Sequence, residues 1–133
     1  MTTLRRGAGG GISRATRRRL RRRDPLVLRV VDCVAAERKV PVEMLLARSR
    51  CRAELAVARR LAMYLMHVVL GRWIGAIAKL FRRHWSTVNR ACYAIEDLRE
   101  DAGFDRDVTR LEAMVVANMN QVAKPRRARN VAA

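Results

Sequence analysis

The sequence lacks most of the signatures of enzymes and membrane proteins. It has no G-x-x-x-x-G-K-[ST] phosphate loop and no Ser/His/Asp or paired-carboxylate arrangement, so we predict that it is not an enzyme. The first 20 residues have no apolar core, which argues against a secretory signal peptide. The apolar run from Leu61 to Met66 is far shorter than the roughly 20 residues that span a membrane, so no membrane segment is expected.

Possible metal ligands are few and scattered. The cysteines are Cys33, Cys51 and Cys92 and the histidines are His67 and His84, without any C-x-x-C or H-x-x-x-H spacing. Zinc sites use closely spaced pairs of such ligands, so we expect no metal and no other cofactor. An odd number of cysteines without a secretory signal fits a reducing cytoplasm, where the thiols pack as small apolar groups.

Acidic residues are scarce and unevenly distributed. The chain has 29 Lys and Arg against 12 Asp and Glu, a formal net charge of +17. Residues 1–23 contain nine arginines and no acid, and residues 121–133 contain four basic residues and no acid. Such ends favour a polyanionic partner, with nucleic acid as the first candidate and an anionic membrane surface as the second. Solvated tails that keep the protein soluble are the alternative.

No stretch alternates apolar and polar residues as a strand does, and no segment repeats. Apolar residues instead recur at intervals of three and four, which predicts amphipathic helices and an all-α fold. We expect one compact domain over residues 24–121. Disordered basic arms at 1–23 and 122–133 should flank it, because they contain little that a core could bury.

The first helix of this domain should begin with Asp24 as its N-cap and Pro25 at its first position, and should end near Arg38. Later helices are expected at 42–46, 52–70, 73–81 and 86–101, and from an Asp105 cap onwards. The second of these should be the longest, with Ser49 as its cap and Gly71 as its left-handed end.

The helices at 73–81 and 86–101 are joined by four residues, a spacing that favours a helix-turn-helix, in which the second helix enters the major groove. Side chains that suit base edges lie at its start: Ser86, Thr87, Asn89 and Arg90. Side chains placed to meet phosphates lie beside them: Lys79, Arg82 and Arg83. The opposite side of this helix should be buried through Val88, Ala91, Cys92, Ile95 and Leu98.

The turn also contains His84 and Trp85, and the tryptophan allows two interpretations. It can face DNA beside the cations, or it can pack over the two helices as part of the core, as tryptophan often does. The sequence leaves both interpretations open.

Two segments carry a family resemblance. Ala58 to Leu65 reads A-R-R-L-A-M-Y-L, and Ile77 to Ile95 reads I-A-K-L-F-R-R-H-W-S-T-V-N-R-A-C-Y-A-I. They resemble the patterns A-R-Q-x-A-M-Y-L and I-G-x-x-F-G-x-R-D-H-T-T-V-x-x-A-x-x-x-I of the C-terminal DNA-binding domain (domain IV) of the bacterial replication initiator DnaA, with one residue fewer in the turn. The resemblance extends over about residues 24–98.

The resemblance implies roles for individual residues. Arg59 matches the family arginine that reaches the minor groove, and Arg83 matches the turn arginine. Arg50 and Arg52 match a basic segment that lies near phosphates in the family. Ser86 and Thr87 match the Thr-Thr pair at the start of the family's recognition helix.

The sequence departs from the family at the reading position. The family's Asp-His is His84-Trp85 here, and the family glycines of the turn and of the I-G pair are Arg82 and Ala78. A DNA-binding scaffold is therefore implied more strongly than the initiator's own target sequence.

We therefore predict a cytoplasmic protein of the bacterial nucleoid that binds double-stranded DNA sequence-specifically and regulates replication initiation or transcription without ATPase activity. A non-specific nucleic-acid binder driven by the basic arms, RNA included, is one alternative. A helical adaptor that binds the replication or transcription machinery is the other. The target sequence and the oligomeric state remain open.

Overall fold

The computed structural model describes residues 14–46 and 53–132, with side chains described up to Gln121. The described residues form helices and no strand, which confirms the all-α fold. The helices are α1 (Arg14–Arg23), α2 (Pro25–Arg38), α3 (Val42–Leu45), α4 (Ala53–Val68), α5 (Ile74–Phe81), α6 (Trp85–Leu98) and α7 (Ala102–Ala132).

The start of α2 follows from its first two residues. The Asp24 carboxylate accepts a hydrogen bond from the backbone N–H of Val27, and Pro25 occupies the first helical turn, where a missing N–H leaves no bond unmade. Lys39 ends the helix in the left-handed conformation, with a φ of 57°. The predicted first helix is thus confirmed at both ends.

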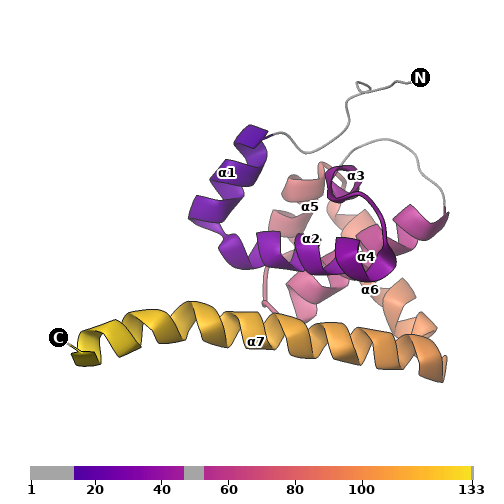
Figure 1. Ribbon diagram of the computed structural model, residues 1–133. Coiled ribbons are helices and arrows are strands. Elements are labelled where there is room, and N and C mark those ends of the chain that lie inside the picture. The colour runs from indigo at the N-terminus through magenta and orange to yellow at the C-terminus, as the bar shows by residue number, and fades with distance from the viewer. Residues whose placement is uncertain (1–13, 47–52, 133) are drawn as a thin grey trace, which may run out of the picture.

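The hydrophobic core forms around α4, which contacts α2, α3, α5 and α6. Figure 1 shows α2 crossing the domain in front of α4, and α7 running along its lower side. Buried aliphatic side chains on one side of α7, Val108, Leu111 and Val115, close that side of the core. Burial of each such side chain stabilises the fold by about 1.5–3 kcal/mol.

Both ends of the chain differ from the prediction. Residues 14–23 form α1, so the prediction of a disordered arm is wrong for this part, while residues 1–13 lie outside the described residues. α7 continues to Ala132, so residues 122–132 are helical where a disordered tail was predicted. α7, with 31 residues, is also longer than α4, with 16, which was predicted to be the longest helix.

Smaller differences concern the cap of α7 and the end of α6. Asp101 caps α7, because its carboxylate accepts a hydrogen bond of 2.8 Å from the Phe104 N–H, whereas the predicted cap Asp105 lies within the first turn. Leu98, predicted to be buried, is 40% exposed. The predicted Ser49 cap lies outside the described residues, and Gly71 adopts the predicted left-handed conformation with a φ of 71°.

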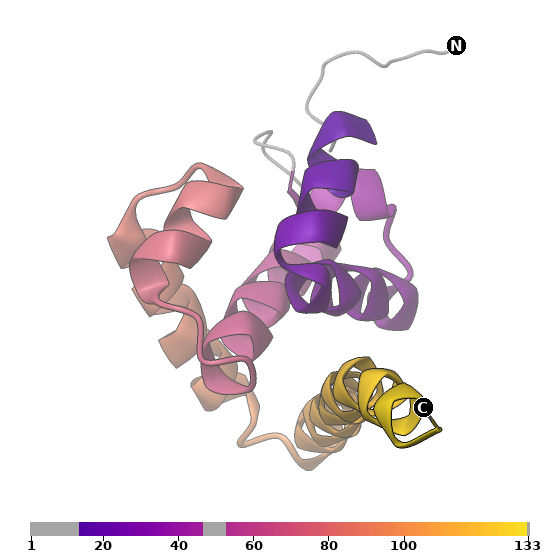
Figure 2. The same cartoon turned by 90° about the vertical axis from the view of Figure 1, so that its left-hand side faces the viewer.

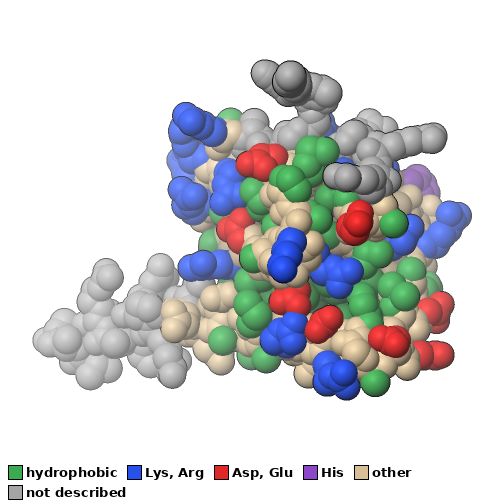
Figure 3. Space-filling model, turned by 45° about the vertical axis from the view of Figure 1, so that its right-hand side comes forward, with side chains coloured by type: hydrophobic (Ala, Val, Ile, Leu, Met, Phe, Trp, Pro, Cys, Tyr) green, Lys and Arg blue, Asp and Glu red, His purple; other side chains and the backbone are tan. Residues whose placement is uncertain are grey.

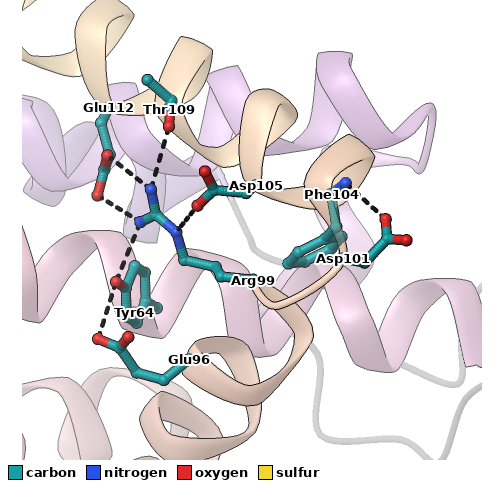
Figure 4. Close-up of polar contacts among 8 residues, drawn as sticks. All are labelled: Tyr64, Glu96, Arg99, Asp101, Phe104, Asp105, Thr109 and Glu112. Carbon is teal, nitrogen blue, oxygen red and sulfur yellow. Dashed lines mark hydrogen bonds and ion pairs between the residues drawn. The ribbon is translucent and has the colours of Figure 1, made fainter.

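Arg99 joins α6, α7 and α4 at the end of α6 (Figure 4). Its guanidinium donates to Asp105 at 2.6 Å and to Glu112 at 2.9 Å on α7, and to the Tyr64 hydroxyl on α4 at 3.1 Å. The Tyr64 hydroxyl in turn donates to Glu96 at 3.0 Å. The hydrogen bond with Glu112 is the main reason that the pKa of Arg99 is raised. This network holds α7 against the domain.

Candidate nucleic-acid interface

The predicted helix-turn-helix is formed by α5, the turn at 82–84 and α6. The turn is tight because Arg82 adopts the left-handed conformation with a φ of 56°, and the Arg83 N–H donates to the Ala78 carbonyl at 2.9 Å. An arginine in this conformation costs about 1–2 kcal/mol, which explains why glycine suits this position in the family pattern. The Gly-to-Arg departure thus keeps the turn and adds a cation.

His84 fixes the start of α6. Its Nδ1 accepts a hydrogen bond of 3.2 Å from the Ser86 N–H, which makes His84 the N-cap, and it lies 2.8 Å from the Ser86 hydroxyl. α6 consequently begins at Trp85, one residue earlier than predicted. With Nδ1 accepting, the neutral ring carries its proton on Nε2, which leaves one donor for an external partner.

Apolar side chains hold α6 in place and decide which side is exposed. Val88, Ala91 and Ile95 are buried in the same core as Ile77 and Phe81 of α5. Cys92 is half-buried, and burial is the main reason that the pKa of its thiol is raised. The remaining side of the α6 start faces outward.

We call the outward surface of residues 79–90 the turn face. The residues exposed on it are Lys79, Arg82, His84, Trp85, Thr87 and Arg90. Arg83, Ser86 and Asn89 are partly exposed. Trp85 is 57% exposed, so its interpretation as a core residue is wrong. Lys79, Arg82 and Arg90 have no ion-pair partner among the described residues.

Arg59 is a buried arginine whose guanidinium is turned toward the end of α3. It is 6% exposed, and its guanidinium donates to the carbonyls of Leu45 at 3.0 Å and Met44 at 2.8 Å. The long side chain thus turns inward and satisfies two carbonyls at the end of α3, and the minor-groove role implied by the family resemblance stays a prediction. Arg50 and Arg52 lie outside the described residues.

The structure adds one basic element that the sequence analysis had treated as an arm. α1 is the helix R-A-T-R-R-R-L-R-R-R, and Leu20 on it packs against the core. The signal available in the sequence was the spacing of Thr16, Leu20 and Asp24, which places three non-basic residues on one side of a helix.

Neither a metal site nor a membrane-spanning helix is found among the described residues. In the part of the chain that the structure describes, no three His, Cys, Asp or Glu side chains come close enough together to hold a metal ion. Within the same residues, none of the helices combines the length and the apolar character that crossing a membrane requires.

Comparison with known proteins identifies the family. The family model described as bacterial dnaA protein helix-turn-helix matches residues 27–95, which extend from α2 into α6 and include the whole turn face. No curated protein matches the chain. Because the match covers 69 of the 133 residues and contains the α5–turn–α6 unit, the protein belongs to the DnaA helix-turn-helix family of DNA-binding domains.

Proposed function

We propose that the protein binds double-stranded DNA sequence-specifically through the turn face and thereby regulates replication initiation or transcription without ATPase activity. The observation that carries the proposal is the division of α6 into two sides. Val88, Ala91 and Ile95 are buried in the core, whereas Thr87 and Arg90 are exposed and free to contact a partner. A helix held in this way can place its first turns in the major groove.

Each side chain of the turn face has a role in this proposal. Arg90 and Asn89 suit guanine and adenine edges, and Ser86 and Thr87 suit either donors or acceptors. Lys79, Arg82 and Arg83 would contact phosphates, which positions the protein without reading sequence. His84 offers its Nε2 proton, and the exposed ring of Trp85 can contact a thymine methyl group.

The regulatory part of the proposal rests on family membership. A protein that carries this domain can compete with the initiator for the same sites, because site recognition by the family resides in the helix-turn-helix. Replication and transcription proteins are the further partners that we would seek.

A non-specific nucleic-acid binder is the second candidate, and α1 is the observation that favours it. Seven of its ten residues are arginines, and cations of this density bind polyanions without reading sequence. The two functions differ in their response to salt, because base contacts persist when phosphate contacts are screened.

The test is selection of duplexes from a random-sequence pool with the whole protein. We expect a defined motif to be enriched, and Thr87→Ala should relax the base preference at one position of that motif. Arg106→Ala, which removes an exposed charge on α7 away from the turn face, is the control and should enrich the same motif as the unaltered protein. Enrichment without any motif would favour the non-specific function.

A further inference from the structure

A cleft of about 640 Å³ lies between α1 and α5, beside the turn face. Its lining includes apolar side chains such as Leu20 and Ile77, together with the cations Arg19, Lys79 and Arg82. Lys79 and Arg82 belong to the turn face as well, so the cleft and the turn face share an edge. Figure 2 shows α1 and α5 on the side of the domain away from α7.

The position of α1 is fixed by Asp24, at the corner between α1 and α2. The Asp24 carboxylate accepts two hydrogen bonds of 2.8 Å from Arg72, one from Nε and one from Nη2. Arg72 also donates to the Leu70 carbonyl at 2.8 Å, which joins this corner to the connection between α4 and α5. The Asp24 N–H donates to the Leu20 carbonyl at 2.7 Å. These bonds hold the end of α1 beside α5.

A second set of contacts fixes the rotation of α1 about its axis. Leu20 packs against the core, and Arg17 forms an ion pair of 3.4 Å with Asp32 of α2. This leaves a stripe of cations on the side next to the cleft. Four arginines line a shallow hollow along that stripe: Arg18, Arg19, Arg22 and Arg23. Arg19 lines both the hollow and the cleft.

The cations of this surface are not neutralised within the protein. None of the four stripe arginines, nor Lys79 or Arg82, has an ion-pair partner among the described residues. Asp24, the one carboxylate among the described residues that line the cleft, is already bound to Arg72. A continuous band of unneutralised cations repels itself, and a polyanion that lies along it relieves that repulsion.

We propose that α1 and the cleft form a second DNA contact, which grips the sugar-phosphate backbone next to the base pairs that α6 reads. Arg19, Lys79 and Arg82 bind successive phosphates of one strand, and Arg22 and Arg23 extend the contact along the same strand. The proposal rests on the proposed function, because the strand reaches the cleft from the turn face through Arg82. DNA is the occupant that this continuity favours over a separate acidic peptide.

The arginines of α1 are expected to contribute differently to DNA binding if α1 is an anchored helix than if it is a flexible arm. Arginines on a flexible arm contact many phosphates in turn, so all of them contribute alike and no phosphate is marked. Arginines on an anchored helix contact phosphates at set positions, and only those on the side of the cleft contribute fully. The proposal is therefore tested by comparing how arginines on the two sides of α1 contribute to DNA affinity.

The experiment compares two double variants that remove the same charge from the same helix. Arg19→Gln with Arg23→Gln alters the cleft side, and Arg14→Gln with Arg21→Gln alters exposed positions on the other side. Glutamine is a good helix former, and circular dichroism checks that both variants keep the helix content of the unaltered protein. The probe is the selected duplex with flanking base pairs, and its affinity is measured against salt concentration.

We expect the cleft-side variant to reduce the slope of log affinity against log salt by about 1.8, the value for two lost phosphate contacts. The variant should also lose ethylation interference at phosphates just outside the motif, while the other variant retains it. Equal changes in the two variants, or no change in either, would overturn the proposal. If selection with the unaltered protein yields no motif, a mixed-sequence duplex is the probe. A larger loss of affinity in the cleft-side variant then means that the second contact stands and sequence-specific reading fails.

Discussion

The turn face and the surface around Arg99 and Arg110, where α7 packs on the domain, both contain exposed or partly exposed cations, but only the second set is paired with carboxylates. We call this second surface the flank. On the flank, Arg99 is bound to Asp105 and Glu112, and Arg110 is bound to Glu37 and Asp107. On the turn face, Lys79, Arg82 and Arg90 have no carboxylate partner among the described residues. Figure 3 shows another cationic surface, over α1 at the upper left, and acidic side chains lying among cations at the lower right.

This difference in pairing separates the arginines that stabilise the fold from those that are available to bind DNA. An arginine that already shares its protons with two carboxylates has little to offer a phosphate, and its removal leaves partly buried carboxylates without a donor. An exposed arginine without such partners contributes little to stability and can exchange its counterions for a phosphate. Substitutions on the flank should therefore lower stability, and those on the turn face should lower DNA affinity.

The largest expected effect is on the flank. Arg99→Ala should lower the free energy of unfolding by about 3 kcal/mol, because the Arg99 side chain is only 19% exposed and its loss leaves Glu112 and Asp105 unpaired. Denaturant titration measures the change. Arg110→Ala is the control, because its side chain is 53% exposed and its removal should cost much less. Equal costs for the two variants would contradict this account of the network.

Arg59→Ala tests the buried arginine next. It should lower the free energy of unfolding by about 2 kcal/mol, because the Leu45 and Met44 carbonyls lose their donor. At temperatures where the variant stays folded, its base preference should remain. A variant with unchanged stability and altered recognition would instead support the minor-groove role that the family resemblance implied.

Arg90→Ala tests the turn face, where we expect a substitution to lower DNA affinity and leave stability unchanged. Loss of a base contact should weaken binding to the selected duplex by about 2 kcal/mol, or roughly 30-fold, with the melting temperature unchanged. Fluorescence anisotropy and thermal unfolding provide the two values. Arg106→Ala, with the same loss of charge on α7, should have a much smaller effect on affinity.

The smallest effect is expected at the corner that fixes α1. Arg72→Gln should lower the free energy of unfolding by about 1 kcal/mol, since a two-bond pair that is partly exposed is lost while Asp24 still caps α2. If α1 is thereby released, the cleft-side and outer arginines should become equivalent in their effect on the salt slope. A difference that survives Arg72→Gln would show that other contacts position α1.

The sequence predicted α2, α5 and α6 well because their signals are local. Asp24 with Pro25 marks the start of α2, and the spacing of Val88, Ala91 and Ile95 marks the buried side of α6. Gly71 likewise marks the end of α4. The cap of α7 was misplaced because Asp101 and Asp105 are both good caps, and only the path of the chain decides between them.

The remaining differences arise from contacts between residues far apart in the chain. α1 is too basic to predict a packed helix, and it depends on the pair between Asp24 and Arg72, 48 residues apart. Arg59 lies 14 residues from the Leu45 carbonyl to which it donates. No periodicity reveals such pairs. Over residues 79–90 the candidate side chains are exposed or partly exposed, because one turn and one helix start bring them to the same surface, and their DNA-binding roles stay predictions.

The most direct test of the central claim is the affinity of the unaltered protein for the selected duplex and for a shuffled duplex of the same composition, at low and high salt. If the turn face reads bases, both affinities fall as salt rises and their ratio persists, because base contacts release no counterions. A ratio near one at both salt concentrations would contradict the claim and leave a protein that binds DNA by charge alone.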